Sequence, residues 1–78
     1  MNKSDMTNKQ AAIFNAEASK SKNKHKGSWA VMRLSIQFSI SANTNLIYWE
    51  NHEHGAVLAY DNGTVCLASR GKIEVIAA

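Results

Sequence analysis

Two histidines and a glutamate occupy alternate positions in WENHEHG, residues 49–55. In an extended chain successive side chains point to opposite faces, so Glu50, His52 and His54 would all point the same way. One carboxylate and two imidazoles suit Zn²⁺ or another transition metal. Full coordination would draw on His25 or Asp61 as well. Because His-x-His is common in surface loops, we expect no bound metal or other cofactor, and Glu50, His52 and His54 are weak candidates.

Lysine occupies every second position of SKSKNKHKG, residues 19–27. Lys20, Lys22, Lys24 and Lys26 could neutralise phosphates and so bind nucleic acid without sequence preference. The alternative is a solvated linker whose lysines keep the protein soluble. The basic charge belongs to this part of the chain: residues 1–27 carry six lysines against two acidic residues, and the remainder carries three basic residues against four acidic ones. We favour the linker, because the near-neutral remainder offers no second basic surface to orient a duplex.

Three further side chains could carry a function: Tyr48, Trp49 and Cys66. Tyr48 and Trp49 are adjacent in an apolar segment and would face opposite sides of a strand, so we expect one of them to be exposed as an anchor for a protein interface. The alternative is a residue that covers the rim of a small barrel. Cys66 is the only cysteine, which excludes a scaffold of internal disulfides. Between Val65 and Leu67 it is expected to behave as a small buried hydrophobe rather than a nucleophile, and we predict no catalytic residue.

Two elements precede these candidate residues. Thr7 followed by Gln10 forms a capping box, which predicts a helix over about residues 8–19. The apolar face of this helix is poor, so we expect it to be marginal and either to fray or to dock through Phe14. From residue 29, WAVMRLSIQFSIS places apolar residues at even positions and mainly polar ones at odd positions. This alternation predicts one long strand with a buried even face and a polar, wet odd face.

Four further segments read as strands: LIYWE, AVLAYD, TVCLAS and KIEVIA. Asn62-Gly63 and Arg70-Gly71 predict two-residue hairpin loops, which fix the register. The pairs that follow are Tyr60–Val65, Leu58–Leu67, Ala59–Cys66, Cys66–Val75 and Ala68–Ile73. Both faces of this hairpin series are apolar, so the sheet must curl into a small barrel or pack on a second layer.

The predicted fold is therefore α+β and mainly β. Residues 1–27 form a polar, basic N-terminal arm with the marginal helix, and residues 28–78 form a small antiparallel β domain. The five strands follow in meander order, as a curled sheet or a small barrel of the SH3-like or Sm-like kind. The likeness to those barrels is one of architecture only, and fold does not imply function.

The apolar runs WAVM and AVLAY are far shorter than the ~20 residues of a membrane span, and shorter than a signal-peptide core. We expect no membrane association and a cytoplasmic location. The absence of catalytic signatures favours a non-enzymatic binding protein that acts through protein contact, of inhibitor or adaptor type, from a phage or mobile element. The alternative is an accessory protein that binds nucleic acid through its basic arm. A domain this small has a thin stability margin, so we also expect either self-association into a homodimer or docking on a partner.

Overall fold

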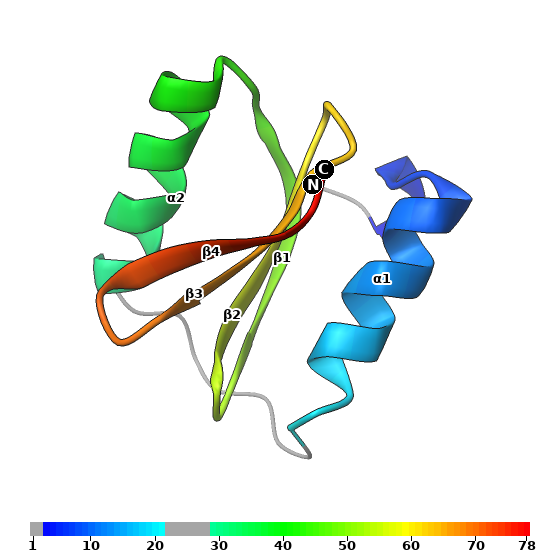
Figure 1. The fold of residues 1–78 in the computed structure, drawn as a ribbon, viewed down its shortest axis with the longest axis horizontal. Coiled ribbons are helices and arrows are strands. Elements are labelled where there is room, and N and C mark those ends of the chain that lie inside the picture. The colour runs from blue at the N-terminus through cyan, green and yellow to red at the C-terminus, as the bar shows by residue number, and fades with distance from the viewer. Residues whose placement is uncertain (1–2, 22–28) are drawn as a thin grey trace.

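The computed structural model describes residues 3–21 and 29–78, with side chains for residues 3–21 and 32–78. The four described strands form one antiparallel sheet in the order β1-β2-β3-β4, and two α-helices cover its opposite faces (Figure 1). The fold is α+β in three layers, helix, sheet and helix. In chain order the elements are η1 (Lys3–Asp5), α1 (Asn8–Ala18), α2 (Trp29–Ala42), β1 (Leu46–His52), β2 (Gly55–Tyr60), β3 (Val65–Ser69) and β4 (Lys72–Ala77).

The helix α2 replaces the long first strand that the sequence predicts. Leu34 and Phe38, one turn apart, pack on the sheet, whereas Ile36 and Ile40 face outward and are 54% and 76% exposed. The sheet of the described residues therefore has four strands rather than five, and it is not closed into a barrel. The predicted five-stranded meander is wrong, and an SH3-like or Sm-like architecture is not confirmed.

Helix α2 ends at Ala42, and backbone hydrogen bonds from the next two residues cap it. Asn43 adopts a left-handed conformation with φ of +52°, which asparagine tolerates better than most residues. The Thr44 N–H then donates to the Ser39 carbonyl at 3.0 Å, and the Asn43 N–H donates to the Ile40 carbonyl at 3.4 Å. This pair of bonds is a Schellman motif, which satisfies carbonyls that the helix leaves without partners. The chain can then turn back into β1.

The capping box of α1 forms as predicted. The Gln10 N–H donates to Thr7 Oγ1 at 3.0 Å, and the Thr7 N–H donates to Gln10 Oε1 at 3.3 Å. The helix runs from Asn8 to Ala18, one residue shorter than the prediction at its C-terminal end. Phe14 is fully buried, and its ring centroid lies 5.4 Å from that of Tyr48. The helix thus docks on the sheet through Phe14, one of the two behaviours expected of it.

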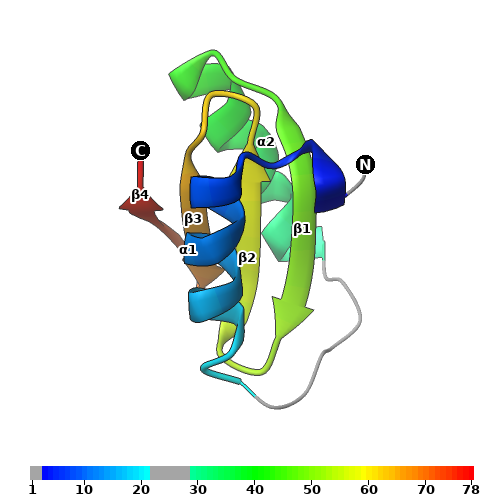
Figure 2. The same ribbon diagram turned by 90° about the vertical axis from the view of Figure 1, so that its right-hand side faces the viewer.

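The two faces of the sheet carry separate apolar cores. Strand β2 contributes to both, because alternate residues point to opposite faces. Figure 2 shows α1 lying across β2 and β3, with β1 and β4 at the edges of the sheet. The core beneath α1 contains Met6, Phe14, Ala18, Val57, Ala59 and Val65, and the core beneath α2 contains Ala56, Leu58, Tyr60, Cys66 and Ala68 with Leu34, Phe38 and Trp49. A second helical layer, rather than closure, thus covers the second apolar face.

One hairpin loop follows the prediction and the other does not. Ser69 pairs with Lys72, so Arg70-Gly71 is a two-residue loop, and the pairs Cys66–Val75 and Ala68–Ile73 are confirmed. In contrast, Tyr60 and Thr64 close the hairpin between β2 and β3, which leaves the three residues 61–63 in its loop. The Gly63 N–H donates to the Tyr60 carbonyl at 3.1 Å, and the Tyr60 N–H donates to the Thr64 carbonyl at 2.9 Å.

This extra loop residue shifts the pairing of β2 with β3 by one position. The observed partners are Ala59–Val65 and Leu58–Cys66. The predicted pairs Tyr60–Val65, Leu58–Leu67 and Ala59–Cys66 are therefore wrong. Three-residue hairpins commonly place a residue in the left-handed region, and Gly63, with φ of +89°, takes that position.

Candidate functional site

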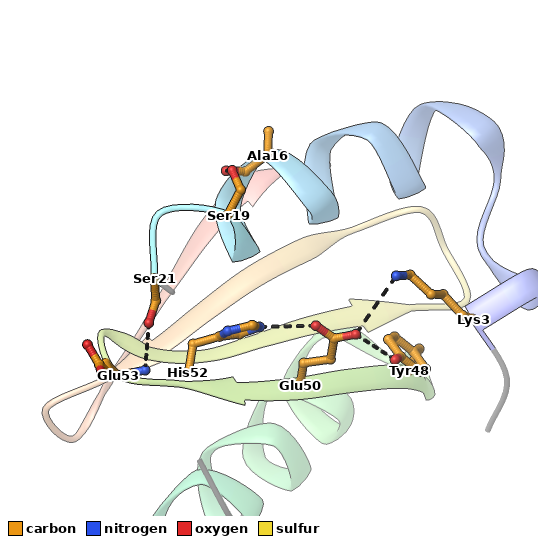
Figure 3. A network of polar contacts seen from close by, with 8 residues as sticks. All are labelled: Lys3, Ala16, Ser19, Ser21, Tyr48, Glu50, His52 and Glu53. Carbon is orange, nitrogen blue, oxygen red and sulfur yellow. Dashed lines mark hydrogen bonds and ion pairs between the residues drawn. The ribbon is translucent and has the colours of Figure 1, made fainter. Parts of the chain in front are cut away.

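A polar network lies on the α1 face of β1, between η1 and the β1–β2 turn (Figure 3). Tyr48, Glu50 and His52 alternate along the strand and so share a face. The Tyr48 hydroxyl donates to Glu50 Oε2 at 2.6 Å, and His52 Nε2 lies 3.0 Å from Glu50 Oε1. Lys3 Nζ, from η1, approaches Glu50 Oε2 at 4.0 Å. Glu50 is thus the centre of the network.

The network holds Tyr48 in its protonated form. The hydrogen bond to the Glu50 carboxylate is the main cause that raises the pKa of Tyr48 to about 12, and burial adds to it. Tyr48 is therefore a neutral donor at physiological pH. The side chains of Glu50 and His52 are only 10% and 5% exposed, so their contact is shielded from water. Such a network orders β1 beneath η1 and orients the His52 ring.

His54 does not continue the strand. β1 ends at His52, which pairs with Gly55, and His54 lies in the turn between them. The ring centroids of His52 and His54 are 6.0 Å apart. Within the described ranges, His52 Nδ1 and both ring nitrogens of His54 are buried and have no hydrogen-bond partner. Buried polar atoms without partners are rare in proteins, so this pair of rings requires an explanation.

The three-ligand metal set considered from the sequence is not assembled in the part of the chain that the structure describes. There, no group of three or more histidine, cysteine, aspartate or glutamate side chains is arranged to hold a metal ion. Asp61 lies elsewhere, bound to Thr44 and Asn45. His25 lies outside the described residues. Glu50 contacts His52 itself, so it supports that ring rather than standing beside it as an equal ligand.

Tyr48 and Trp49 point to opposite faces, as their adjacency predicts, but neither is exposed. Tyr48 packs in the core beneath α1, Trp49 packs in the core beneath α2, and both are half-buried. Among the described residues the exposed large apolar side chains are instead Ile36, Ile40 and Val75. Sequence reasoning missed Ile36 and Ile40 because it assigned them to the buried face of a strand. Their four-residue spacing is the signal that a helical interpretation would have used.

The lysine run is described only at its first member. Lys20 Nζ lies 2.7 Å from Glu17 Oε2, and this hydrogen bond is the main cause that raises the pKa of Lys20. Lys22, Lys24 and Lys26 lie outside the described residues. Lys20 is thus already engaged with an acidic side chain of α1.

Cys66 is fully buried in the core beneath α2, and burial raises the pKa of its thiol to about 11. A thiol of that kind is a packing residue, as the sequence predicts.

None of the described helices is both long enough and apolar enough to cross a membrane. No protein-family model, no curated protein and no solved structure matches the chain. The candidate surfaces come from the geometry alone. They are the outer side of α2 with Ile36 and Ile40, the edge strand β4 with Val75, and the network around Glu50.

Proposed function

We propose that this protein is a non-enzymatic binding protein that acts through contact with another protein, as an inhibitor or adaptor. The observation that carries the proposal is the outer side of α2. Ile36 and Ile40 are separated by one helical turn, so they form a single ridge, and both are more than half exposed. Paired apolar anchors at this spacing are typical of a helix that lies in a groove of its partner.

The surroundings of the ridge support the same function. Arg33 lies one turn before Ile36 and is exposed, as is Gln37 beside it. Interfaces commonly combine an apolar centre with a polar rim and are enriched in arginine. We therefore propose a partner whose apolar groove has a polar or acidic border. The α2 ridge thus consists of Ile36 and Ile40, and Arg33 lies at its polar rim.

The test compares two double variants of the full chain in affinity capture from the cells that produce it, after nuclease treatment. Ile36→Ser with Ile40→Ser removes the apolar anchors, and Ser41→Ala with Ala42→Ser is the matched control at the exposed end of the same helix. We expect a captured protein to be lost with the isoleucine variant and retained with the control, with circular dichroism unchanged in both. Equal recovery from both variants would show that α2 does not carry the contact.

The basic N-terminal third supports binding of nucleic acid as the second candidate. Residues 1–27 hold six of the nine basic residues of the chain. Replacing Lys20, Lys22, Lys24 and Lys26 by Ala would remove up to about four phosphate contacts and flatten the salt dependence of binding. We expect the quadruple variant to retain its fold and its protein partner. Loss of activity in the source cell with the fold intact would place nucleic acid first.

The proposed setting is the reducing cytoplasm, since the single cysteine is a free buried thiol. An origin in a phage or mobile element stays part of the proposal.

A homodimer is also part of the proposal. The edge strand β4 supports self-association, because Val75 is half exposed there and an edge strand presents backbone groups to a further strand. Sedimentation velocity of the wild type and of Val75→Lys tests this: only the wild type should dimerise.

A further inference from the structure

We infer that His52 and His54 form a binding site for Zn²⁺ and that Glu50 is the residue that positions His52 for it. The site lies on the β1–β2 turn and does not involve the α2 ridge, so it is independent of the proposed protein contact. The inference rests on three observations: the contact of His52 with a carboxylate, the buried nitrogens without partners, and the separation of the two rings.

The tautomer of His52 follows from its contact with Glu50. An ionised carboxylate only accepts hydrogen bonds, so His52 Nε2, 3.0 Å from Glu50 Oε1, must carry the proton. In the neutral ring the lone pair is then on Nδ1. Histidines that bind metals usually donate their other ring N–H to a carboxylate, a carbonyl or water in this manner. His52 is thus already held in the form that a metal ion requires.

The lone pair on His52 Nδ1 has nothing to accept from. His52 is only 8% exposed, and Nδ1 is buried with no hydrogen-bond partner in the described ranges. A buried acceptor without a partner destabilises the folded protein. Both ring nitrogens of His54 are likewise buried without a partner, and in the neutral ring one of them carries a lone pair and the other a proton. Two adjacent imidazoles, each with a buried lone pair that no donor meets, point to a shared ligand that supplies positive charge.

The distance between the rings fits one zinc ion. Zinc lies about 2.0–2.1 Å from a coordinating nitrogen, hence roughly 3.2 Å from the ring centroid, so two rings that share an ion have centroids at most about 6.4 Å apart. The observed separation is 6.0 Å. A tetrahedral angle at the ion brings the centroids to roughly 5.2 Å, so the rings need to approach by under about 1 Å. His54 lies in the turn between β1 and β2, so this approach requires a rotation of its side chain rather than a movement of a strand.

The donor set selects the kind of ion. Imidazole nitrogens suit Zn²⁺, whereas Ca²⁺ and Mg²⁺ require oxygen ligands. Two histidines leave two tetrahedral positions, which water fills when the ion binds. Cys66 cannot be a ligand, because it is buried on the opposite face of the sheet, in the core beneath α2. Since Glu50 Oε1 and Oε2 contact His52 and Tyr48, Glu50 acts on the metal through His52.

The test is calorimetric titration of the untagged full chain with ZnCl₂, together with ¹⁵N NMR of the histidine side chains. We expect one zinc ion per chain and a large shift of the His52 Nδ1 resonance on binding. His54→Ala should weaken binding at least ~10-fold, and so should Glu50→Gln, since loss of such a supporting carboxylate typically costs 10–100-fold. His25→Ala is the matched control, because it removes the only other histidine, and it should bind zinc as the wild type does.

Three results would overturn the inference. One is no saturable binding of zinc to the wild type, which would leave water as the partner of these nitrogens. Another is binding that leaves the His52 Nδ1 resonance unchanged, which would place the metal elsewhere. The third is an equal loss of affinity with His25→Ala and His54→Ala. The NMR readout is taken on the wild type, so it holds even where a variant alters the turn.

Discussion

The side-chain amide of Gln10 donates a hydrogen bond to the carbonyl oxygen of Tyr60 at 2.7 Å, which ties α1 to the end of β2. The same nitrogen donates to the Thr64 carbonyl at 3.1 Å, so it spans the β2–β3 loop. The amide oxygen of Gln10 meanwhile accepts from the Thr7 N–H. Gln10 therefore caps its own helix and holds that helix against the sheet, and it is only 2% exposed.

Replacing Gln10 by Glu separates these two roles. Glutamate keeps an acceptor for the Thr7 N–H but has no donor, and it places a carboxylate against two carbonyl oxygens. We expect Gln10→Glu to lower the free energy of unfolding by about 2–3 kcal/mol at neutral pH. Thr7→Ala, which removes only the hydroxyl of the cap, should cost about 1 kcal/mol. Urea unfolding measures both, and a Gln10→Glu variant as stable as Thr7→Ala would show that the link to the sheet contributes nothing.

The two sides of α2 should respond differently to truncation. Phe38 packs beneath the helix with its ring centroid 4.8 Å from that of Tyr60, whereas Ile36 is 54% exposed. We expect Phe38→Ala to cost about 3 kcal/mol and Ile36→Ala less than about 0.5 kcal/mol. Thermal or urea unfolding provides the comparison. Comparable losses from the two variants would restore the strand interpretation, in which both side chains are buried.

The inward and outward positions of these side chains explain why the sequence predicts a strand where the structure has α2. In a helix, residues two apart point to nearly opposite sides, so an alternating pattern places Leu34 and Phe38 inward and Ile36 and Ile40 outward. The alternation is the same in either interpretation. What differs is length, because thirteen residues without a turn residue exceed an ordinary strand and suit a helix. Ile36 and Ile40 are apolar although they are exposed. They complete the row of apolar even positions that predicts a strand.

Two glycines with positive φ form a matched pair. Gly55 has φ of +138°, and a Cβ added there would lie 2.5 Å from the Ala68 carbonyl oxygen. Gly71 has φ of +76°, and a Cβ there would meet nothing within 4 Å. We expect Gly71→Ala to cost about 1 kcal/mol from backbone strain alone. Gly55→Ala adds a collision with backbone and should cost more than about 3 kcal/mol. Equal melting temperatures would mean that β2 and β3 approach less closely at this point.

Asp61 should make the protein sensitive to acid. Its carboxylate accepts from the Thr44 hydroxyl and from the Asn45 N–H, and these bonds, the Thr44 bond first, lower the pKa of Asp61. The folded pKa is below the unfolded one, so the unfolded chain takes up the proton first and stability falls as pH drops below about 4. Asp61→Asn should be less stable than the wild type at pH 7, and the difference should shrink as the pH falls through the lowered pKa of Asp61 in the folded state.

The measurement for Asp61 is the urea midpoint of both proteins from pH 2 to pH 7. Thr44→Val is the partner variant, because it removes the hydrogen bond that contributes most to the lowered pKa of Asp61. The stability of this variant should therefore depend less on acid pH than that of the wild type. A difference between the wild type and Asp61→Asn that is constant across this range would exclude the carboxylate as its source.

Short sequence motifs predicted those features of the fold that depend on residues close together in the chain. The Thr7–Gln10 cap, the Arg70-Gly71 loop and the shared face of Glu50 and His52 follow from short spacings. The contact of Gln10 with Tyr60 spans fifty residues and leaves no local trace. His54 was misplaced because the strand had to end before it for Gly55 to pair with His52. The tautomer of His52 likewise depends on a distance that spacing alone does not fix.

The division of the apolar side chains into two cores has a consequence for how the protein opens. Cys66 is fully buried, belongs to the core beneath α2 and is the only thiol of the chain. A disulfide reagent can therefore reach it only when α2 lifts from the sheet or the whole chain unfolds, and departure of α1 alone leaves it covered. The rate of thiol modification under native conditions thus reports the breathing of one layer of the sandwich independently of the other.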